Sequence, residues 1–162
     1  MEKHGFDDVH GGEFVSFCKK VEYLPVTVDI LVASLACRQT GAVWSYPYIK
    51  ENSSRGIVAG IEKSAEASVI QKELLVAFKV HSGRDTDLRD IVMLSRELNF
   101  DKVRKHVKRG DKSKLDKQVV HEVKLIADPR FLPSLKGMFE IPGDFSKEIA
   151  RAMEFLERLK AE

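Results

Sequence analysis

The sequence predicts an α+β protein in which a small mixed β-sheet with flanking helices precedes a C-terminal helical subdomain. Short apolar, β-branched runs bounded by glycine and proline fill the chain up to about residue 70. From residue 71 onward, apolar residues recur with the period of amphipathic helices. Strands that precede helices, rather than alternating with them, are typical of the α+β class. We therefore expect an α/β core over 1–70 and a helical subdomain over 71–162.

The clearest strand is expected at 25–32, where β-branched residues dominate and apolar residues lie on both faces, as in a buried central strand. Pro25 suits its first position, because a missing N–H costs little there. Shorter strands are expected at 13–18, 56–61 and 67–70. Gly41, Pro47 and further loop-forming residues punctuate 34–54, which predicts a loop with a short helix.

Two helices are expected to meet at a glycine turn. The first begins near Gln71, carries an apolar face and ends at Gly83, a residue that suits a helix C-terminus. Asp85 or Thr86 is expected to cap the second helix, whose apolar stripe has the 3.6-residue period. The chain therefore turns sharply near Gly83.

Further helices are expected in the remainder of the chain. Asp101 is expected to cap a short basic helix that ends at Gly110, and Ser113 begins a longer helix that ends before Pro129. A short helix or turn is expected at 131–139. The last helix is marked by apolar residues at helical spacing, namely Ile149, Met153, Leu156 and Leu159.

Composition places the chain among soluble globular proteins. Its 162 residues are 43% hydrophobic and 32% charged, which is typical of a folded domain with a core of its own. The apolar runs are too short to span a bilayer, and the first residues carry no signal-peptide pattern, so we expect no membrane association and a cytoplasmic location. Cys18 and Cys37 have no metal-ligand spacing and are expected to be reduced, partly buried thiols.

Positive charge is concentrated in one segment, 102–117. Eight basic residues stand there against two aspartates, so the segment carries +6 while the whole chain carries +2 and the rest −4. The segment has no interleaved aromatic residues, so base stacking is not indicated. It is either a solvated basic face or a site for nucleic acid or an acidic protein partner. Its candidate binding residues are Lys102, Arg104, Lys105, Lys108 and Arg109.

The expected helix–turn–helix corner at 79–91 gathers more charge than a tight turn needs. Asp87 and Asp90 are three residues apart, so they project from the same side of the second helix. Lys79 and Arg84 come from the preceding helix and turn. One interpretation is a salt-bridge cluster that locks the two helices together. The other is a site in which Lys79 and Arg84 hold phosphate oxygens while the two aspartates orient them.

Two further residues have open interpretations. Asp29 lies inside an otherwise apolar strand, where an ionised carboxylate is costly unless it is paired, bound to metal or at an open strand end. It is either a water-facing edge residue or a catalytic or metal-binding carboxylate. His81 lies close to Lys79 and is either structural, merely exposed or catalytic.

Two segments together resemble the nucleotidyltransferase superfamily with the polymerase-β-like fold. Leu24-Pro25-Val26-Thr27-Val28-Asp29-Ile30-Leu31-Val32 looks like the strand that carries the third carboxylate of that family. The segment 73–91 is similar to a Lys, Arg, Asp, Asp signature of prokaryotic minimal and toxin-type members, matched in order by Lys79, Arg84, Asp87 and Asp90. The resemblance covers roughly residues 21–98.

The resemblance implies a function and an incomplete site. It implies binding of a nucleoside triphosphate with Mg²⁺, a catalytic and metal-binding role for Asp29, and nucleotide or phosphate contacts by the corner residues. No Gly-Ser helix start and no Asp-x-Asp pair precede Asp29. We therefore expect a truncated nucleotidyltransferase-like core that binds nucleotide but is not catalytically complete alone, and that a partner chain can complete.

Two other hypotheses come from different functional classes. The first is a non-enzymatic module that binds nucleic acid or a protein partner through the basic segment 102–117. The second is a structural subunit that forms homo-oligomers through an exposed sheet edge.

Overall fold

The α+β class expected from the sequence is confirmed in the computed structural model, which describes residues 7–8, 16–20, 27–31, 34–139 and 144–160. It describes the side chains of residues 34–135 and 144–160. The strands are β1 (Asp7–Asp8), β2 (Ser16–Lys20), β3 (Thr27–Leu31), β4 (Ser34–Ala36), β5 (Val43–Ser45), β6 (Ser53–Ala59) and β7 (Ser64–Ile70). The helices are α1 (Tyr46–Glu51), α2 (Lys72–Ser82), α3 (Asp85–Leu94), α4 (Phe100–Val107), α5 (Lys112–Ile126), α6 (Phe131–Phe139) and α7 (Ser146–Lys160).

The described strands form three small sheets, and every pairing between them is antiparallel. The first sheet has the order β1-β2-β3, while β4 pairs with β5 and β6 pairs with β7. The sequence led us to expect one mixed sheet with Asp29 on a central strand. Instead, β2 is the middle strand of its sheet, and Asp29 on the outer strand β3 lies opposite Cys18. The connections between paired strands are short enough for antiparallel pairing, whereas a parallel pair needs a long crossover.

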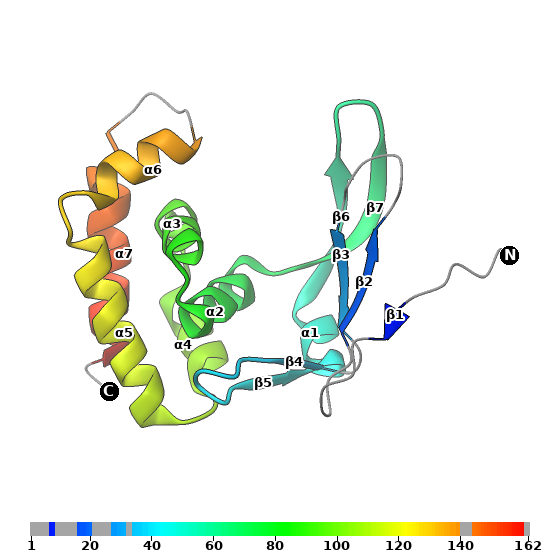
Figure 1. Cartoon of the computed structure of the whole chain (residues 1–162), viewed down its shortest axis with the longest axis horizontal. Helices are drawn as coiled ribbons and strands as arrows, with labels where there is room; N and C mark the ends of the chain where they lie inside the picture. Colours follow the sequence, from blue (N-terminus) through cyan, green and yellow to red (C-terminus); the bar gives the residue numbers. More distant parts are fainter. Residues whose placement is uncertain (1–6, 9–15, 21–26, 32–33, 140–143, 161–162) are drawn as a thin grey trace, which may run out of the picture.

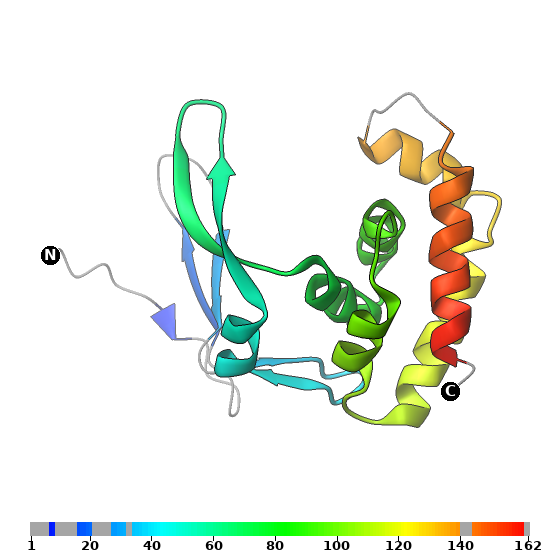
Figure 2. The same ribbon diagram turned by 180° about the vertical axis from the view of Figure 1, so that it is seen from behind.

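The helices from α2 onward make one compact group, and β4–β5 reaches toward it from the strand-rich side (Figure 1). In both views α5 and α7 run alongside each other (Figures 1 and 2), and they are in contact.

None of the helices in the described part of the chain combines the length and apolarity needed to cross a membrane. The division into domains 1–70 and 71–162 stays a prediction, although helix α2 does begin at Lys72.

Helix α2 lies between two hydrophobic clusters, which explains why it is apolar on more than one side. Val76, Ala77 and Val80 belong to the main core, which the helices α2 to α7 build. Leu74 belongs to a smaller cluster with Ala42 and Trp44 of the β4–β5 hairpin.

The region 34–54, expected to be a loop with a short helix, is therefore a hairpin followed by α1. Burial of Trp44 against α2 favours this hairpin, although its strands are only three residues long.

Three expected helix caps differ in the structure. The N-cap of α3 is Arg84 rather than Asp85 or Thr86, because Arg84 is extended and Asp85 already has helical geometry. Asn99, not Asp101, caps α4 and accepts a hydrogen bond from the Lys102 backbone N–H. Similarly, the helix expected from Ser113 begins one residue earlier, at Lys112, and is capped by Asp111. The Arg84 side chain makes no capping hydrogen bond, whereas Asn99 and Asp111 have the short polar side chains that favour caps.

Candidate functional site

The corner between α2 and α3 depends on a glycine. Gly83 ends α2 in the left-handed region with φ of 58°, a conformation that costs glycine little. A Cβ at this position would overlap the Gln118 side chain of α5. The sharp turn directs the last turn of α2 toward the first turns of α3, so residues from both helices meet on one side of the corner.

All four charged residues singled out in the sequence meet at this corner. Lys79 Nζ lies 2.7 Å from Asp87 Oδ1 and 2.6 Å from Asp90 Oδ2. The Arg84 Nε–H donates to Asp87 Oδ2 at 2.7 Å. The Asp87 side chain is only 1% exposed, whereas that of Arg84 is 70% exposed. The structure therefore contains the salt-bridge cluster that was one interpretation of the sequence, and leaves Arg84 accessible to solvent.

Asp87 and Lys79 are both ionised at neutral pH. Burial raises the pKa of the Asp87 carboxyl, but hydrogen bonds from Arg84, Lys79 and Ser82 outweigh burial and bring that pKa to about 2. Burial likewise lowers the pKa of Lys79, and its hydrogen bonds to Asp87 and Asp90 more than compensate, so the Lys79 pKa is raised. Lys79 is thus engaged by two carboxylates, and Arg84 is the more accessible cation for a phosphate group.

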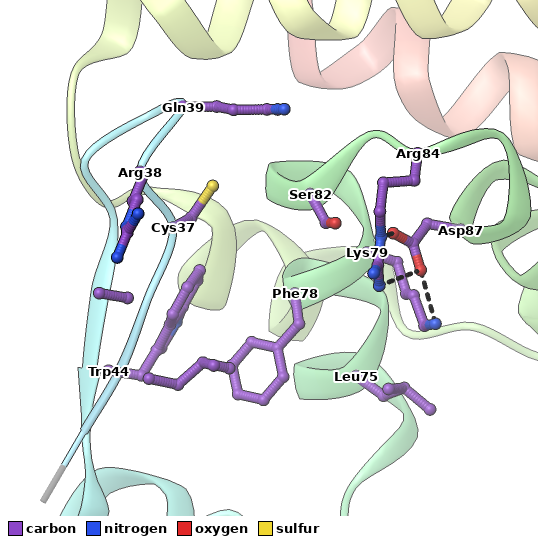
Figure 3. A pocket seen from close by; sticks show the side chains of 12 residues that line it. Cys37, Arg38, Gln39, Trp44, Leu75, Phe78, Lys79, Ser82, Arg84 and Asp87 are labelled. Carbon is purple, nitrogen blue, oxygen red and sulfur yellow. Dashed lines mark hydrogen bonds and ion pairs between the residues drawn. The ribbon is translucent and has the colours of Figure 1, made fainter. Parts of the chain in front are cut away.

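A cavity of about 440 Å³ opens between this corner and the β4–β5 hairpin. Figure 3 shows Arg38 and Gln39 of the hairpin on one side and Lys79, Arg84 and Asp87 on the other. Its apolar lining includes Trp44 and Phe78, whose rings meet edge to face at 4.7 Å between centroids. The cavity, called the corner cavity below, therefore combines an aromatic lining with arginines on opposite walls.

Buried polar contacts attach the hairpin wall of this cavity to the helices. The Thr40 hydroxyl lies 2.7 Å from His81 Nδ1, and His81 Nε2 lies 2.9 Å from the Val107 carbonyl oxygen. Since a carbonyl only accepts, Nε2 carries the proton, and Nδ1 accepts from Thr40. Burial lowers the pKa of His81, so the ring is neutral. Both ring nitrogens are engaged in structural contacts, which favours the structural interpretation of His81.

A second buried histidine, His106, anchors the other end of the hairpin region. Its Nδ1 lies 2.6 Å from the Tyr48 hydroxyl, and its carbonyl oxygen accepts a hydrogen bond from Trp44 Nε1 at 3.2 Å. Burial, together with the nearby cations Lys105 and Arg109, lowers the pKa of His106. No specific role of His106 was predictable from the sequence, because its partners lie more than fifty residues away along the chain.

The basic residues of 102–117 do not form one uniform face. Lys102 and Lys105 are exposed on α4. Arg104 and Lys108 line a second cavity with Arg109. The Arg109 guanidinium also stacks on the Tyr48 ring at 4.0 Å and donates to the Val43 carbonyl, so it fastens the hairpin as well. Binding of a partner by these five residues stays a prediction.

The Mg²⁺ site predicted at Asp29 is a separate question from the corner. Asp29 lies on β3, but its side chain lies outside the described residues. Among the side chains that are described, no group of three or more His, Cys, Asp or Glu residues is arranged to hold a metal ion. Asp87 and Asp90 both bind Lys79, so they do not suit a Mg²⁺ site. Mg²⁺ binding and a catalytic role for Asp29 stay predictions.

Sequence reasoning missed two features of the site. Arg38, Trp44 and Phe78 line the corner cavity, although they lie up to forty residues apart in the sequence and form no motif there. Glu122 of α5 is completely buried behind Gly83, and its Oε1 accepts from Gln118 Nε2 at 3.1 Å. Burial raises the pKa of Glu122 well above its usual value. Its position on an otherwise ordinary amphipathic helix gave no signal in the sequence.

Comparisons with family models, with curated proteins and with solved structures gave no match to this chain.

Proposed function

We propose that this protein binds a nucleotide in the corner cavity, as a nucleotidyltransferase-like module. The single observation that supports this proposal most is the pairing of an aromatic lining with arginines on opposite walls of a cavity of about 440 Å³. Small-molecule sites have volumes of about 300–1,000 Å³ and combine an apolar lining with few polar groups. The resemblance of the segment 73–91 to a nucleotidyltransferase signature adds to this support.

Arg84 is the residue expected to bind phosphate. Asp87 holds its Nε, and a weaker contact of 3.4 Å joins one terminal nitrogen to the same carboxylate. A guanidinium fixed in this way loses little side-chain entropy on binding, and its planar donors match phosphate oxygens. Lys79 and Asp90 keep Asp87 in place, so we expect them to position Arg84 rather than to touch the ligand.

The opposite wall would hold the other part of the nucleotide. Arg38 is exposed on the hairpin, and the apolar lining between the two arginines includes Phe78 and Leu75. A nucleobase has apolar faces that pack favourably on such side chains, whereas its phosphates need cations. The proposal concerns binding, and no chemical step is assigned to the described residues.

Titration of the labelled chain with ATP, with and without Mg²⁺, tests this proposal by NMR. Shifts are expected at Arg38, Phe78 and Arg84, and Arg84→Ala is expected to weaken binding by about tenfold or more, since a charged hydrogen bond is worth about 1.5–3 kcal/mol. Arg38→Ala supplies an independent test, because Arg38 has no part in the ion cluster.

Arg130→Ala is the matched control. Arg130 is an exposed arginine that is also held by a nearby aspartate, Asp128, but it lies outside the corner cavity. Its replacement is expected to leave ATP binding unchanged. If ATP causes no shifts at the cavity, or if all three alanine variants bind ATP equally, the proposed function is wrong.

A further inference from the structure

A second cavity, called the basic cavity here, lies where the α4–α5 connection meets the end of α7. Its volume is about 450 Å³. In both overall views the end of α7 lies beside the first turns of α5 (Figures 1 and 2). Its lining consists of Arg104, Val107, Lys108, Arg109, Gly110, Lys112, Leu115, Asp116 and Leu159. This cavity has no part in the proposed nucleotide site.

The lining pairs positive charge with aliphatic surface. Four cationic residues stand against a single carboxylate, Asp116. The apolar members are Val107, Leu115 and Leu159, and none of the residues that line the cavity is aromatic. A ligand that fits this lining carries several negative charges around an aliphatic group.

Backbone contacts and a helix cap hold the turn that forms the cavity. Gly110 has a φ of 71°, and a Cβ at this position would overlap the backbone at Thr40 and Gly41. The Asp111 backbone N–H donates to the Thr40 carbonyl at 2.8 Å, and its side chain caps α5. These contacts fix the connection while the side chain of Lys112 stays exposed. Replacing Lys112 therefore tests binding without disturbing the fold.

We propose that the basic cavity docks an acidic segment of a partner protein that inserts an aliphatic side chain. The aliphatic group occupies the surface formed by Val107, Leu115 and Leu159, while flanking carboxylates meet the surrounding cations. Charge complementarity selects a polyanion over a neutral peptide. The aliphatic lining without aromatic residues favours a peptide over single-stranded nucleic acid, whose bases stack on aromatic rings.

Fluorescence anisotropy with synthetic probes tests this docking. The first probe is a labelled peptide with one leucine between glutamates, and the second has alanine in place of that leucine. The leucine peptide is expected to bind about tenfold more tightly, because burial of the larger side chain is favourable. Lys112→Glu is expected to weaken both peptides several-fold, and Leu159→Ala only the leucine peptide. Added salt is expected to weaken both.

Lys63→Glu is the control, since it reverses an exposed charge on the β6–β7 turn, outside the basic cavity. This variant is expected to bind the leucine peptide and the alanine peptide with the same affinities as the wild type. Equal affinity for the leucine and alanine peptides would overturn the proposal. So would tighter binding of an oligouridylate than of the leucine peptide, which would point to nucleic acid, or an unchanged affinity in Lys112→Glu.

Discussion

Replacing Asp87 by asparagine is the most direct test of the corner. Asp87 receives hydrogen bonds from Lys79, Arg84 and Ser82, and its side chain is almost completely buried. The asparagine has nearly the same shape but no charge. It also places an N–H donor where the wild-type carboxylate oxygen accepts from a cation, so at least one donor loses its partner.

The size of the effect follows from the pKa of Asp87. Its fall from 3.8 to about 2 corresponds to roughly 2 kcal/mol of stability at neutral pH, since each pKa unit is worth about 1.4 kcal/mol. The folded-state pKa is lower than the unfolded one, so this stability is fully present above pH 3.8. It is lost as the pH falls from 3.8 to about 2, where the folded-state carboxyl also takes up a proton.

Urea unfolding followed by the fluorescence of Trp44, the single tryptophan, measures this effect. Asp87→Asn is expected to lower the free energy of unfolding by roughly 2 kcal/mol at neutral pH, with the difference from wild type shrinking below pH 3.8. Asp85→Asn is the control, because Asp85 is exposed in the same first turn of α3. Equal losses in the two variants, or a loss at Asp87 that does not change with pH, would refute the assigned role of the Asp87 charge.

Two further predictions concern the packing of α5 against the corner. Glu122→Gln is expected to raise the free energy of unfolding above that of the wild type, by an amount that grows as pH rises above about 4.5. The reason is that burial holds the Glu122 pKa above its usual value and disfavours the ionised folded state. Urea unfolding of both proteins at acidic and mildly basic pH checks this, and a difference between them that does not change with pH would contradict it. Gly83→Ala is expected to lower the free energy of unfolding by about 1–3 kcal/mol more than Gly41→Ala does. Both glycines have positive φ, but of the two only Gly83 lies against another side chain. Thermal unfolding of both variants measures the difference, and equal losses would show that contact with Gln118 is unimportant.

The helical half of the chain was largely predictable from the sequence. The helices α2 to α7 follow an apolar period that reflects one shared core, so pattern alone located them. Their caps were less predictable, since Asn99 and Asp101, or Asp111 and Ser113, are chemically similar candidates two residues apart. Such a choice depends on backbone geometry that periodicity does not report.

The β4–β5 hairpin could not be predicted, because distant partners decide its structure. Its strands have three residues each, too few for a pattern of alternation. Contacts of Thr40 with His81, and of Trp44 with His106, connect it to helices that follow much later in the chain.

The charged corner was predictable because its residues are close together in the sequence. Lys79, Arg84, Asp87 and Asp90 lie within twelve residues, so local helix geometry was enough to bring them together.

The two walls of the corner cavity are held in place by different forces. The ion cluster around Asp87 fixes the helical wall, and the Asp87 carboxyl stays ionised until the pH falls toward its pKa of about 2. The hairpin wall depends on neutral contacts, since His81 accepts from Thr40 and donates to Val107 within the core. His81 stands two residues before Gly83, so α2 is part of both walls. The separation of the two walls is therefore set by α2, and a ligand between Arg38 and Arg84 would meet a cavity whose width the core of the protein determines.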